Sequence, residues 1–325
     1  MAIKGQSQVF DYAQKDQYAN CKVLLFESAG DIRRHTREML KQMGFEKILE
    51  TGDFDSFQSA FGSGKYDLII GDTSTNRGDV CDFVQRIRHN DIGMDPFPGI
   101  ILTMTDTLES KIRFAINSGA DHLVAKPYSP LQVSERIQAI VDRRKRFLVT
   151  LDYVGPDRRA RGRNSSSQNL ITVPNALRAK VRNDPAAIAT PETVRTTIKR
   201  IDGLKVLRHD LEIGVLVELL RTEKSSDTDF RRADRLEKLQ DLVAMMKTMV
   251  PKTEFVEVKP MCLALSSIVT DIRKSDSLTK SELDSLEEAS MALHLCFHPE
   301  KTISIITQEI TDAVAAIARR RRKRK

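Results

Sequence analysis

The sequence predicts a doubly wound α/β domain with a five-stranded parallel sheet, followed by a basic linker and an all-α C-terminal region. Five short apolar runs alternate with five amphipathic stretches in the N-terminal part of the chain, which is the βαβα pattern of such a domain. The apolar runs are continuous, as expected for parallel strands that are covered on both faces. With 325 residues, the chain has room for about two domains at roughly 100–200 residues each.

The predicted strands are the five apolar runs, of which the second (KILE) is the weakest. They are residues 23–26, 47–50, 67–70, 98–102 and 122–125. Each run is followed by a stretch with helical spacing of its apolar residues. The parallel arrangement follows, because each helix returns the chain to the same end of the sheet.

The predicted helices are residues 31–44, 54–61, 80–89, 108–117 and 129–144. In the first of them, Ile32, Met39, Leu40 and Met43 fall on one side. Glycine ends the first helix, and glycines follow the second and fourth. The fifth begins with a Ser-Pro pair, which supplies a side-chain cap and a proline in the first turn.

Beyond the α/β pattern, residues 146–190 cluster Gly, Pro, Arg and Ser without a period and are predicted to be a linker. Helical spacing returns afterwards, at residues 191–208, 210–221, 229–249, 260–274, 280–296 and 299–318. The predicted organisation is a flexible arm (1–20), an α/β domain (21–145), a linker (146–190), a helical domain (191–318) and a basic tail (319–325).

The positive charge of the chain is concentrated in two segments. Residues 141–185 hold 11 basic and 4 acidic residues, and all of residues 319–325 are basic, while the two predicted domains are slightly acidic. Such a tail can contact nucleic acid, an anionic membrane or an acidic partner, or it can remain solvated.

Several protein classes are excluded by composition. The four cysteines are widely spaced, which fits neither a zinc site nor a disulfide scaffold and indicates reduced thiols. No apolar run is long enough for a transmembrane helix, and the N-terminus lacks the apolar stretch of a secretory signal. We therefore expect a cytoplasmic protein.

One histidine pair has the spacing of metal ligands. His294 and His298 lie four residues apart in a predicted helix. Glu300 is the only acidic residue nearby in the sequence, so we interpret the two histidines as a surface pair.

Chemically useful side chains follow four of the predicted strands. Glu27 follows the first strand, Asp72 the third, Thr103 the fourth and Lys126 the fifth. Ligands of open α/β sheets bind at the carboxyl ends of the strands, so these side chains should meet at one edge. Two carboxylates, a hydroxyl and an ammonium at one edge suit phosphoryl transfer assisted by Mg²⁺.

Residues 21–142 resemble a response-regulator receiver domain, over a little more than a third of the chain. The resemblance is carried by YDLIIGD ending in Asp72, IILT ending in Thr103 and GADHLVAKP containing Lys126 and Pro127. It implies that Asp72 is the phosphoacceptor, Thr103 the switch hydroxyl and Lys126 the phosphate-sensing lysine. It also implies a cis Lys126–Pro127 peptide bond.

The resemblance further implies a Mg²⁺ ion held by Glu27, Asp72 and the backbone carbonyl of Ser74. The chain departs from the family at several points, two of which bear on the metal site and the switch. Ser28 stands where the family has a directly ligating acid, and a hydroxyl is a poor ligand for a hard cation. Leu123 stands where the family often has an aromatic switch residue.

These observations lead to two functional hypotheses. The first is a bacterial response-regulator-like protein of a phosphorelay, not an enzyme, that is phosphorylated on Asp72 by a sensor histidine kinase or a phosphotransfer protein. It would signal through contacts of its helical region with an unknown protein partner. The alternative is a pseudo-receiver that is not phosphorylated and binds nucleic acid or a nucleotide second messenger through its arginine-rich linker and tail.

Overall fold

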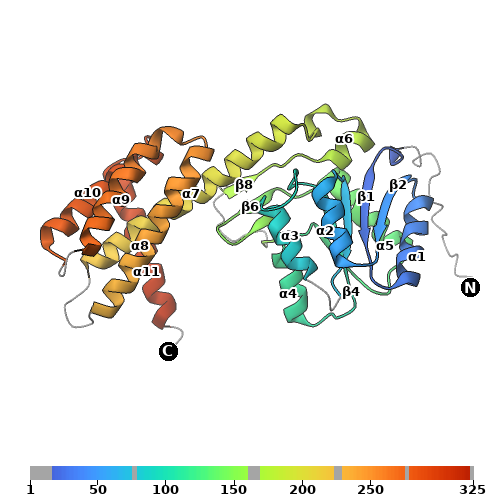
Figure 1. Cartoon of the computed structure of the whole chain (residues 1–325), viewed down its shortest axis with the longest axis horizontal. Coiled ribbons are helices and arrows are strands. Elements are labelled where there is room, and N and C mark those ends of the chain that lie inside the picture. The colour runs from blue at the N-terminus through green and yellow to red at the C-terminus, as the bar shows by residue number, and fades with distance from the viewer. Residues whose placement is uncertain (1–16, 75–78, 160–168, 223–228, 275–277, 323–325) are drawn as a thin grey trace, which may run out of the picture. The chain divides into compact units, whose positions relative to one another are not determined.

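The computed structural model describes residues 17–74, 79–159, 169–222, 229–274 and 278–322 (Figure 1). The chain divides into two compact units, residues 1–198 and 199–325. The boundary between them falls within helix α7 (Pro191–Arg221).

The first unit is built on a five-stranded parallel sheet with the order β2-β1-β3-β4-β5. Its strands are β1 (Lys22–Phe26), β2 (Lys47–Thr51), β3 (Leu68–Asp72), β4 (Gly99–Met104) and β5 (His122–Ala125). The predicted fold class is thereby confirmed. The order is that of a doubly wound sheet, whose strand order reverses direction between β1 and β3.

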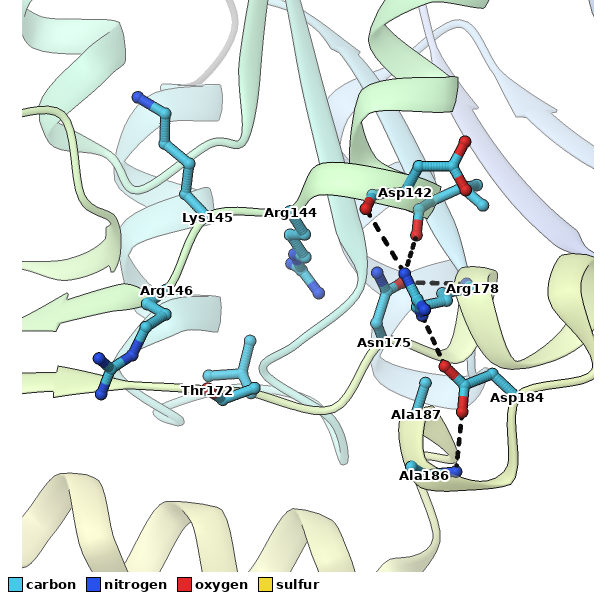
Figure 2. A pocket seen from close by; sticks show the side chains of 12 residues that line it. Asp142, Arg144, Lys145, Arg146, Thr172, Asn175, Arg178, Asp184, Ala186 and Ala187 are labelled. Carbon is cyan, nitrogen blue, oxygen red and sulfur yellow. Dashed lines mark hydrogen bonds and ion pairs between the residues drawn. The ribbon is translucent and has the colours of Figure 1, made fainter.

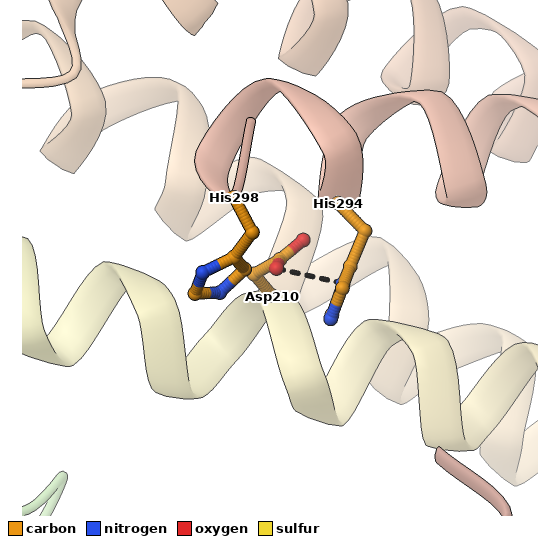
Figure 3. A group of neighbouring side chains, drawn as sticks. All are labelled: Asp210, His294 and His298. Carbon is orange, nitrogen blue, oxygen red and sulfur yellow. Dashed lines mark ion pairs between the residues drawn. The ribbon is translucent and has the colours of Figure 1, made fainter. Parts of the chain in front are cut away.

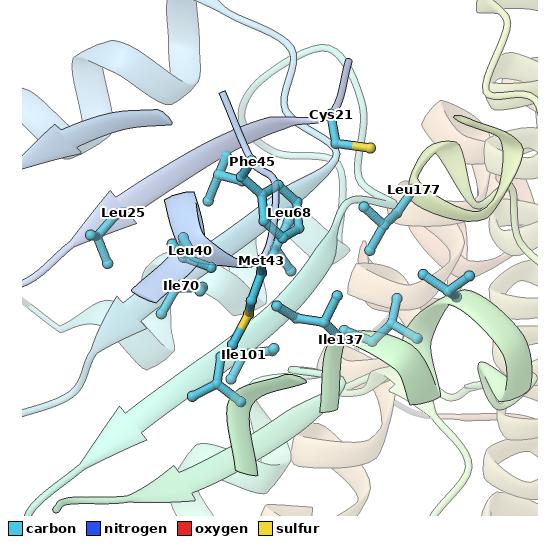
Figure 4. Close-up of a cluster of buried hydrophobic side chains, with 14 of the residues drawn as sticks. Cys21, Leu25, Leu40, Met43, Phe45, Leu68, Ile70, Ile101, Ile137 and Leu177 are labelled. Atoms are coloured by element: carbon cyan, nitrogen blue, oxygen red, sulfur yellow. The ribbon is translucent and has the colours of Figure 1, made fainter. Parts of the chain in front are cut away.

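Five helices cover the two faces of this sheet. They are α1 (Gly30–Gln42), α2 (Phe54–Ser63), α3 (Val80–Arg88), α4 (Glu109–Asn117) and α5 (Pro130–Arg143). Residues of α1 and α5 pack on one face and residues of α2, α3 and α4 on the other. In β1, Leu25 belongs to the first core and Leu24 to the second, because successive side chains of a strand point to opposite faces (Figure 4).

Local sequence fixes where these helices begin. Asp53 and Asp79 accept hydrogen bonds from backbone N–H groups at the starts of α2 and α3. Ser129 and Gln132 form a capping box at the start of α5, with a proline in its first turn, as the sequence predicts.

The prediction of a linker at residues 146–190 is wrong. This segment forms a small antiparallel sheet with the order β7-β6-β8, followed by helix α6 and a 3₁₀ turn. Their bounds are β6 (Phe147–Val149), β7 (Val154–Pro156), β8 (Leu170–Ile171), α6 (Ala176–Arg182) and η3 (Pro185–Ala187). Strands of two or three residues are too short to show a period. Leu177 of α6 is fully buried in the core that α1 and α5 cover (Figure 4).

A buried ionic network holds this segment against the large sheet. Asp121, just before β5, receives Arg88 Nη2 of α3 at 2.9 Å and Arg144 Nε at 2.9 Å. Both guanidinium groups lie over the Phe147 ring of β6, with the Arg88 and Arg144 carbons 5.1 and 5.0 Å from its centroid. Arg144 belongs to the basic residues 141–185, so part of the positive charge of that stretch has a structural role.

Close backbone contact adds to this attachment. Gly119 has a φ of +89°, and a Cβ added there would lie 2.4 Å from the carbonyl oxygen of Val154 in β7. Only glycine permits this approach. Arg158, after β7, donates to the carbonyl oxygen of Ala120 at 2.6 Å.

The predicted N-terminal arm extends too far along the chain. Residues 1–16 lie outside the described residues, but residues 17–20 are packed on the first unit. The Tyr18 ring lies 4.6 Å from the Phe45 ring, and the Tyr18 carbonyl accepts a hydrogen bond from the Cys21 N–H at 2.9 Å.

The second unit is helical, as predicted. It contains most of α7, then α8 (Asp229–Met249), the turns η4 (Val250–Lys252) and η5 (Val256–Val258), α9 (Lys259–Lys274), α10 (Lys280–Phe297) and α11 (Ile303–Arg322). Helix α7 is continuous where the sequence predicts a break at residue 209. The basic tail begins within α11, and residues 323–325 are not described. Within the described part of the chain, no helix is both long and apolar enough to cross a bilayer.

Candidate functional site

The carboxyl end of the five-stranded sheet gathers the charged residues that the sequence predicts there. Asp72 is the last residue of β3, Glu27 follows β1 and Lys126 follows β5. The two carboxylic residues are nearly inaccessible, with 1% of Asp72 and 2% of Glu27 exposed. Buried acids at the end of a parallel sheet need a cationic partner.

Lys126 is that partner for both carboxylates. Its Nζ lies 2.7 Å from Asp72 Oδ1 and 2.5 Å from Glu27 Oε2. Its backbone N–H donates to the carbonyl oxygen of Met104 in β4 at 2.8 Å, and the Lys126–Pro127 peptide bond is cis, as the sequence predicts. One ammonium thus serves two acids, which leaves the cluster with one negative charge when both acids are ionised.

The electrostatics reflect this shortage of positive charge. Burial raises the pKa of Glu27 and the nearby charge of Asp72 adds to the rise, against the lowering effect of the hydrogen bond from Lys126. For Lys126, burial favours the neutral amine. The hydrogen bonds and negative charges of Asp72 and Glu27 outweigh that effect and raise the pKa of Lys126. Lys126 is therefore charged at neutral pH.

Thr103 lies directly beside the phosphoacceptor candidate in the sheet. The β3–β4 register pairs Asp72 with Thr103, which is 2% exposed. The Thr103 carbonyl accepts the Thr73 N–H at 2.9 Å and the Thr73 hydroxyl at 3.1 Å. Among the described residues, no hydrogen bond joins the Thr103 hydroxyl to the Asp72 carboxylate. The structure therefore brings Thr103 to the site without engaging its hydroxyl there.

Ser74, whose carbonyl is a predicted metal ligand, is held close to Asp72. Its N–H donates to Asp72 Oδ1 at 3.0 Å, and its hydroxyl oxygen lies 3.1 Å from the Thr105 hydroxyl oxygen. Ser28, in contrast, is exposed. The end of β3 is thus tied to the end of β4.

Two further contacts shape the site and are not evident from the sequence. Arg33 of α1 donates to the Glu27 carbonyl at 2.8 Å, which fixes the turn after β1. The hydroxyls of Thr36 and Tyr128 are 2.7 Å apart and link α1 to the segment after Lys126. The pairing of Arg33 with a backbone carbonyl has no signal in the sequence, because it depends on the path of the turn.

The interpretation of His294 and His298 as a surface pair is wrong for His294. Only 2% of His294 is exposed, and its Nδ1 lies 2.7 Å from Oδ2 of Asp210. Asp210 is 84 positions away in the chain and belongs to α7, so proximity in sequence could not reveal it.

The comparisons with known proteins agree with this architecture. The family model described as the response regulator receiver domain matches residues 23–138. The phosphate regulon transcriptional regulatory protein PhoB of Escherichia coli (strain K12) is 29% identical over 122 residues, covering 38% of this chain and 52% of PhoB. The transcriptional regulatory protein QseB of Haemophilus influenzae is 30% identical over 125 residues, covering 38% of this chain and 53% of QseB.

Among solved structures, the chemotaxis response regulator CheY4 of Vibrio cholerae is 22% identical, with a TM-score of 0.33, covering 36% of this chain and 96% of CheY4. The chain spans about half the length of the two curated relatives named above. Residues 23–138 of this chain are therefore a response regulator receiver domain.

Proposed function

We propose that this chain is a response-regulator-like signalling protein of a phosphorelay that accepts a phosphoryl group on Asp72. A sensor histidine kinase or a phosphotransfer protein would be the donor. The observation that carries the proposal is the position of Lys126 Nζ, 2.7 Å from Oδ1 of a carboxylate at the end of β3. This ammonium can neutralise charge on a phosphoryl group that is bonded to Asp72.

The contacts of Asp72 indicate which oxygen reacts. Oδ1 accepts the Ser74 N–H and lies next to Lys126 Nζ. We therefore assign Oδ2 as the nucleophile, because phosphorylation there displaces neither contact. The Oδ2–phosphorus bond forms as the phosphorus–nitrogen bond of the donor phosphohistidine breaks. The imidazole leaves with the electron pair, and the product is an acyl phosphate.

The donor atoms at this site fit a hard divalent cation such as Mg²⁺. Glu27 and Asp72 offer buried carboxylate oxygens, and the Ser74 carbonyl is the third candidate ligand. One negative charge remains after Lys126 is counted, which favours a cation at this place. When bound, Mg²⁺ supplies charge neutralisation to the phosphoryl oxygens. Ser28 lowers the number of acids below that of the family, so we expect weak binding.

Phosphorylation would change the charge balance of the site. The acyl phosphate carries nearly two negative charges in place of the single charge of the free carboxylate, and it competes with Glu27 for Lys126. The Thr103 hydroxyl, which does not bind Asp72 in this structure, is then free to bind a phosphoryl oxygen. The protein would signal through contacts of its helical region with a protein partner, in the bacterial cytoplasm, where its four free cysteines stay reduced.

The test is the intact mass of the full chain after incubation with acetyl phosphate and Mg²⁺. We expect a gain of one phosphoryl group that hydroxylamine removes. The gain should be absent in Asp72→Asn and present in Asp106→Asn, which alters an exposed carboxylate near the same edge. No gain in the wild type, or an equal gain in Asp72→Asn, would refute the proposal.

The alternative function, binding of nucleic acid or a nucleotide second messenger, has weaker support. A cavity of about 310 Å³ in the basic segment is lined by Arg144, Arg146 and Arg178 among others (Figure 2). These arginines already bind the protein itself: Arg144 pairs with Asp121, Arg178 with Asp184, and Arg146 donates to the Leu170 carbonyl. Salt-sensitive polyanion binding that is lost on deletion of residues 319–325, and is unchanged in Asp72→Asn, would support this alternative.

A further inference from the structure

The second unit contains a buried cluster of one aspartate and two histidines. Asp210 lies on α7, His294 on the last turns of α10, and His298 directly after α10 (Figure 3). Each of the three residues offers a ligand atom, and these atoms lie within 4.8 Å of one another. Only 1% of Asp210 and 2% of His294 are exposed, and 17% of the His298 side chain is exposed.

The Asp210 carboxylate is buried without the donors that such a group requires. Neither of its oxygens has a hydrogen-bond partner within the described ranges, and the same holds for His294 Nδ1. The 2.7 Å separation between Asp210 Oδ2 and His294 Nδ1 places two potential ligand atoms next to each other. A carboxylate that is only 1% exposed is costly to keep ionised unless a positive charge lies next to it. A cation between the three side chains would remove that cost.

The geometry of α10 presents both imidazoles on one side. His298 follows His294 by four residues, and its N–H donates to the His294 carbonyl at 3.0 Å, so the helical turn is intact between them. The two ring centroids are 5.5 Å apart. Asp210 approaches this pair from α7, which gives three ligands from two helices.

Glu300 supports the orientation of one imidazole. Its Oε1 lies 3.5 Å from His298 Nδ1. A carboxylate next to one ring nitrogen of a histidine orients the ring and increases the basicity of the other nitrogen, which is the usual arrangement around protein metal ions.

The local charge also favours a divalent cation. Two acids, Asp210 and Glu300, lie at the cluster. The nearby positive charge of Lys301 is engaged by Glu309, whose Oε2 lies 2.8 Å from the Lys301 Nζ. An imidazole that binds a metal ion does so as the neutral ring, so a bound dication would meet a site with a negative balance of charge.

We propose that Asp210, His294 and His298 form a binding site for a divalent transition-metal ion, with Zn²⁺ the best match. Two imidazole nitrogens and one carboxylate oxygen are a zinc-type ligand set, whereas Mg²⁺ and Ca²⁺ prefer oxygen ligands alone. Three protein ligands leave a fourth position for water. The ion would join α7 to the end of α10 and stabilise the helical unit.

The test measures Zn²⁺ binding by the metal-free full chain, with Mg²⁺ in excess so that the acidic site of the receiver domain does not contribute. We expect one equivalent of Zn²⁺ to bind, and the thermal midpoint of the helical unit to rise with it. In His298→Gln the affinity should fall more than about 100-fold, because loss of a ligand should exceed the 10–100-fold effect of losing an outer-shell partner. His35→Gln, which removes an exposed histidine of α1, should bind as the wild type does.

A second variant changes an exposed residue that is not a ligand, so its effect on Zn²⁺ binding does not depend on disturbed folding. Glu300 is 67% exposed at its side chain, so Glu300→Gln leaves the core unchanged. It should weaken Zn²⁺ binding by about tenfold or more. Co²⁺ bound in place of Zn²⁺ should show the absorption bands of a tetrahedral site, absent in His298→Gln. No Zn²⁺ binding by the wild type, or equal affinity in the wild type and His298→Gln, would overturn the proposal.

Discussion

Two buried carboxylates, one at the amino ends and one at the carboxyl ends of the strands of the same sheet, have opposite electrostatic surroundings. Asp121, at the amino end of β5, is bound by the guanidinium groups of Arg88 and Arg144 and by the Ile100 N–H. Asp72, at the carboxyl end of β3, shares the single ammonium of Lys126 with a second acid. One edge has positive charge in excess and the other has negative charge in excess.

The pKa directions express the same difference. Burial acts to raise the pKa of Asp121, but the charges of Arg144 and Arg88 outweigh it and lower that pKa. For Glu27, beside Asp72, burial prevails and the pKa is raised. A carboxylate with all its partners stabilises the fold. Two carboxylates that share one ammonium keep a negative charge that a cation could neutralise, which is the arrangement that the proposed function requires.

The largest expected effect on stability comes from removing one of the two guanidinium groups that bind Asp121. Arg88→Met leaves Asp121 with one guanidinium and should lower the free energy of unfolding by about 3–5 kcal/mol, because a buried carboxylate loses one of its two cationic partners. Urea unfolding followed by tyrosine fluorescence would measure this, since there is no Trp and all five Tyr lie in the first unit.

The control for this change is Arg34→Met, which breaks an exposed ion pair with Asp31 in α1. Exposed pairs contribute at most about 1 kcal/mol, so the loss should be small. Equal losses in the two variants would mean that the network around Asp121 has no special structural role.

A slightly smaller effect is expected where β7 contacts the receiver domain. Gly119→Ala places a Cβ 2.4 Å from the Val154 carbonyl at a φ of +89°, and should cost about 2–4 kcal/mol in unfolding free energy. Gly62→Ala, in α2 with open space around the new Cβ, should instead be neutral or stabilising by up to about 1 kcal/mol. If Gly119→Ala were as stable as Gly62→Ala, the close approach of β7 would not be required.

The sequence predicted the residues at the carboxyl end of the sheet better than those at the amino end. Asp72, Thr103 and Lys126 were predictable because each ends or follows a continuous apolar run, and parallel strands bring such positions together. The partners of Asp121 were not, because Arg88 and Arg144 lie 33 and 23 positions away and have no periodic signal.

The same limit explains the missed structure of residues 146–190. The strands β6, β7 and β8 have three, three and two residues, and their stability comes from contacts with the receiver domain rather than from local propensity. Asp210 was missed for a related reason, since its partner His294 lies on another helix. Strand ends are encoded locally, whereas docking surfaces depend on the completed fold.

At the carboxyl end of the sheet, where one ammonium serves two acids, the raised pKa of Glu27 should make the free energy of unfolding depend on pH. The raised pKa of Glu27 stabilises the folded state fully below its ordinary pKa of 4.5, and this contribution is lost as the pH rises through the raised value. Glu27→Gln removes the loss, so its unfolding free energy should increase relative to the wild type as the pH rises above about 4.5, by about 1.4 kcal/mol per unit of pKa difference. Urea titrations at several pH values would measure the slope. A difference between Glu27→Gln and the wild type that does not change with pH would contradict the assignment.

The smallest expected effect is on Mg²⁺ affinity, and it is tested by adding the acid that the family has at position 28. Ser28→Asp places a third carboxylate at the edge where one ammonium already serves two, and should tighten Mg²⁺ binding by about tenfold, or about 1.4 kcal/mol. Isothermal titration calorimetry would measure the change, with Ser59→Asp on the exposed side of α2 adding equal charge elsewhere. Tighter binding in Ser28→Asp alone would show that the number of acids limits the site. Equal Mg²⁺ affinity in both variants would mean that the number of acids does not limit the site. Lys126, which is held by Glu27 and Asp72, would then control the access of Mg²⁺ to those carboxylates.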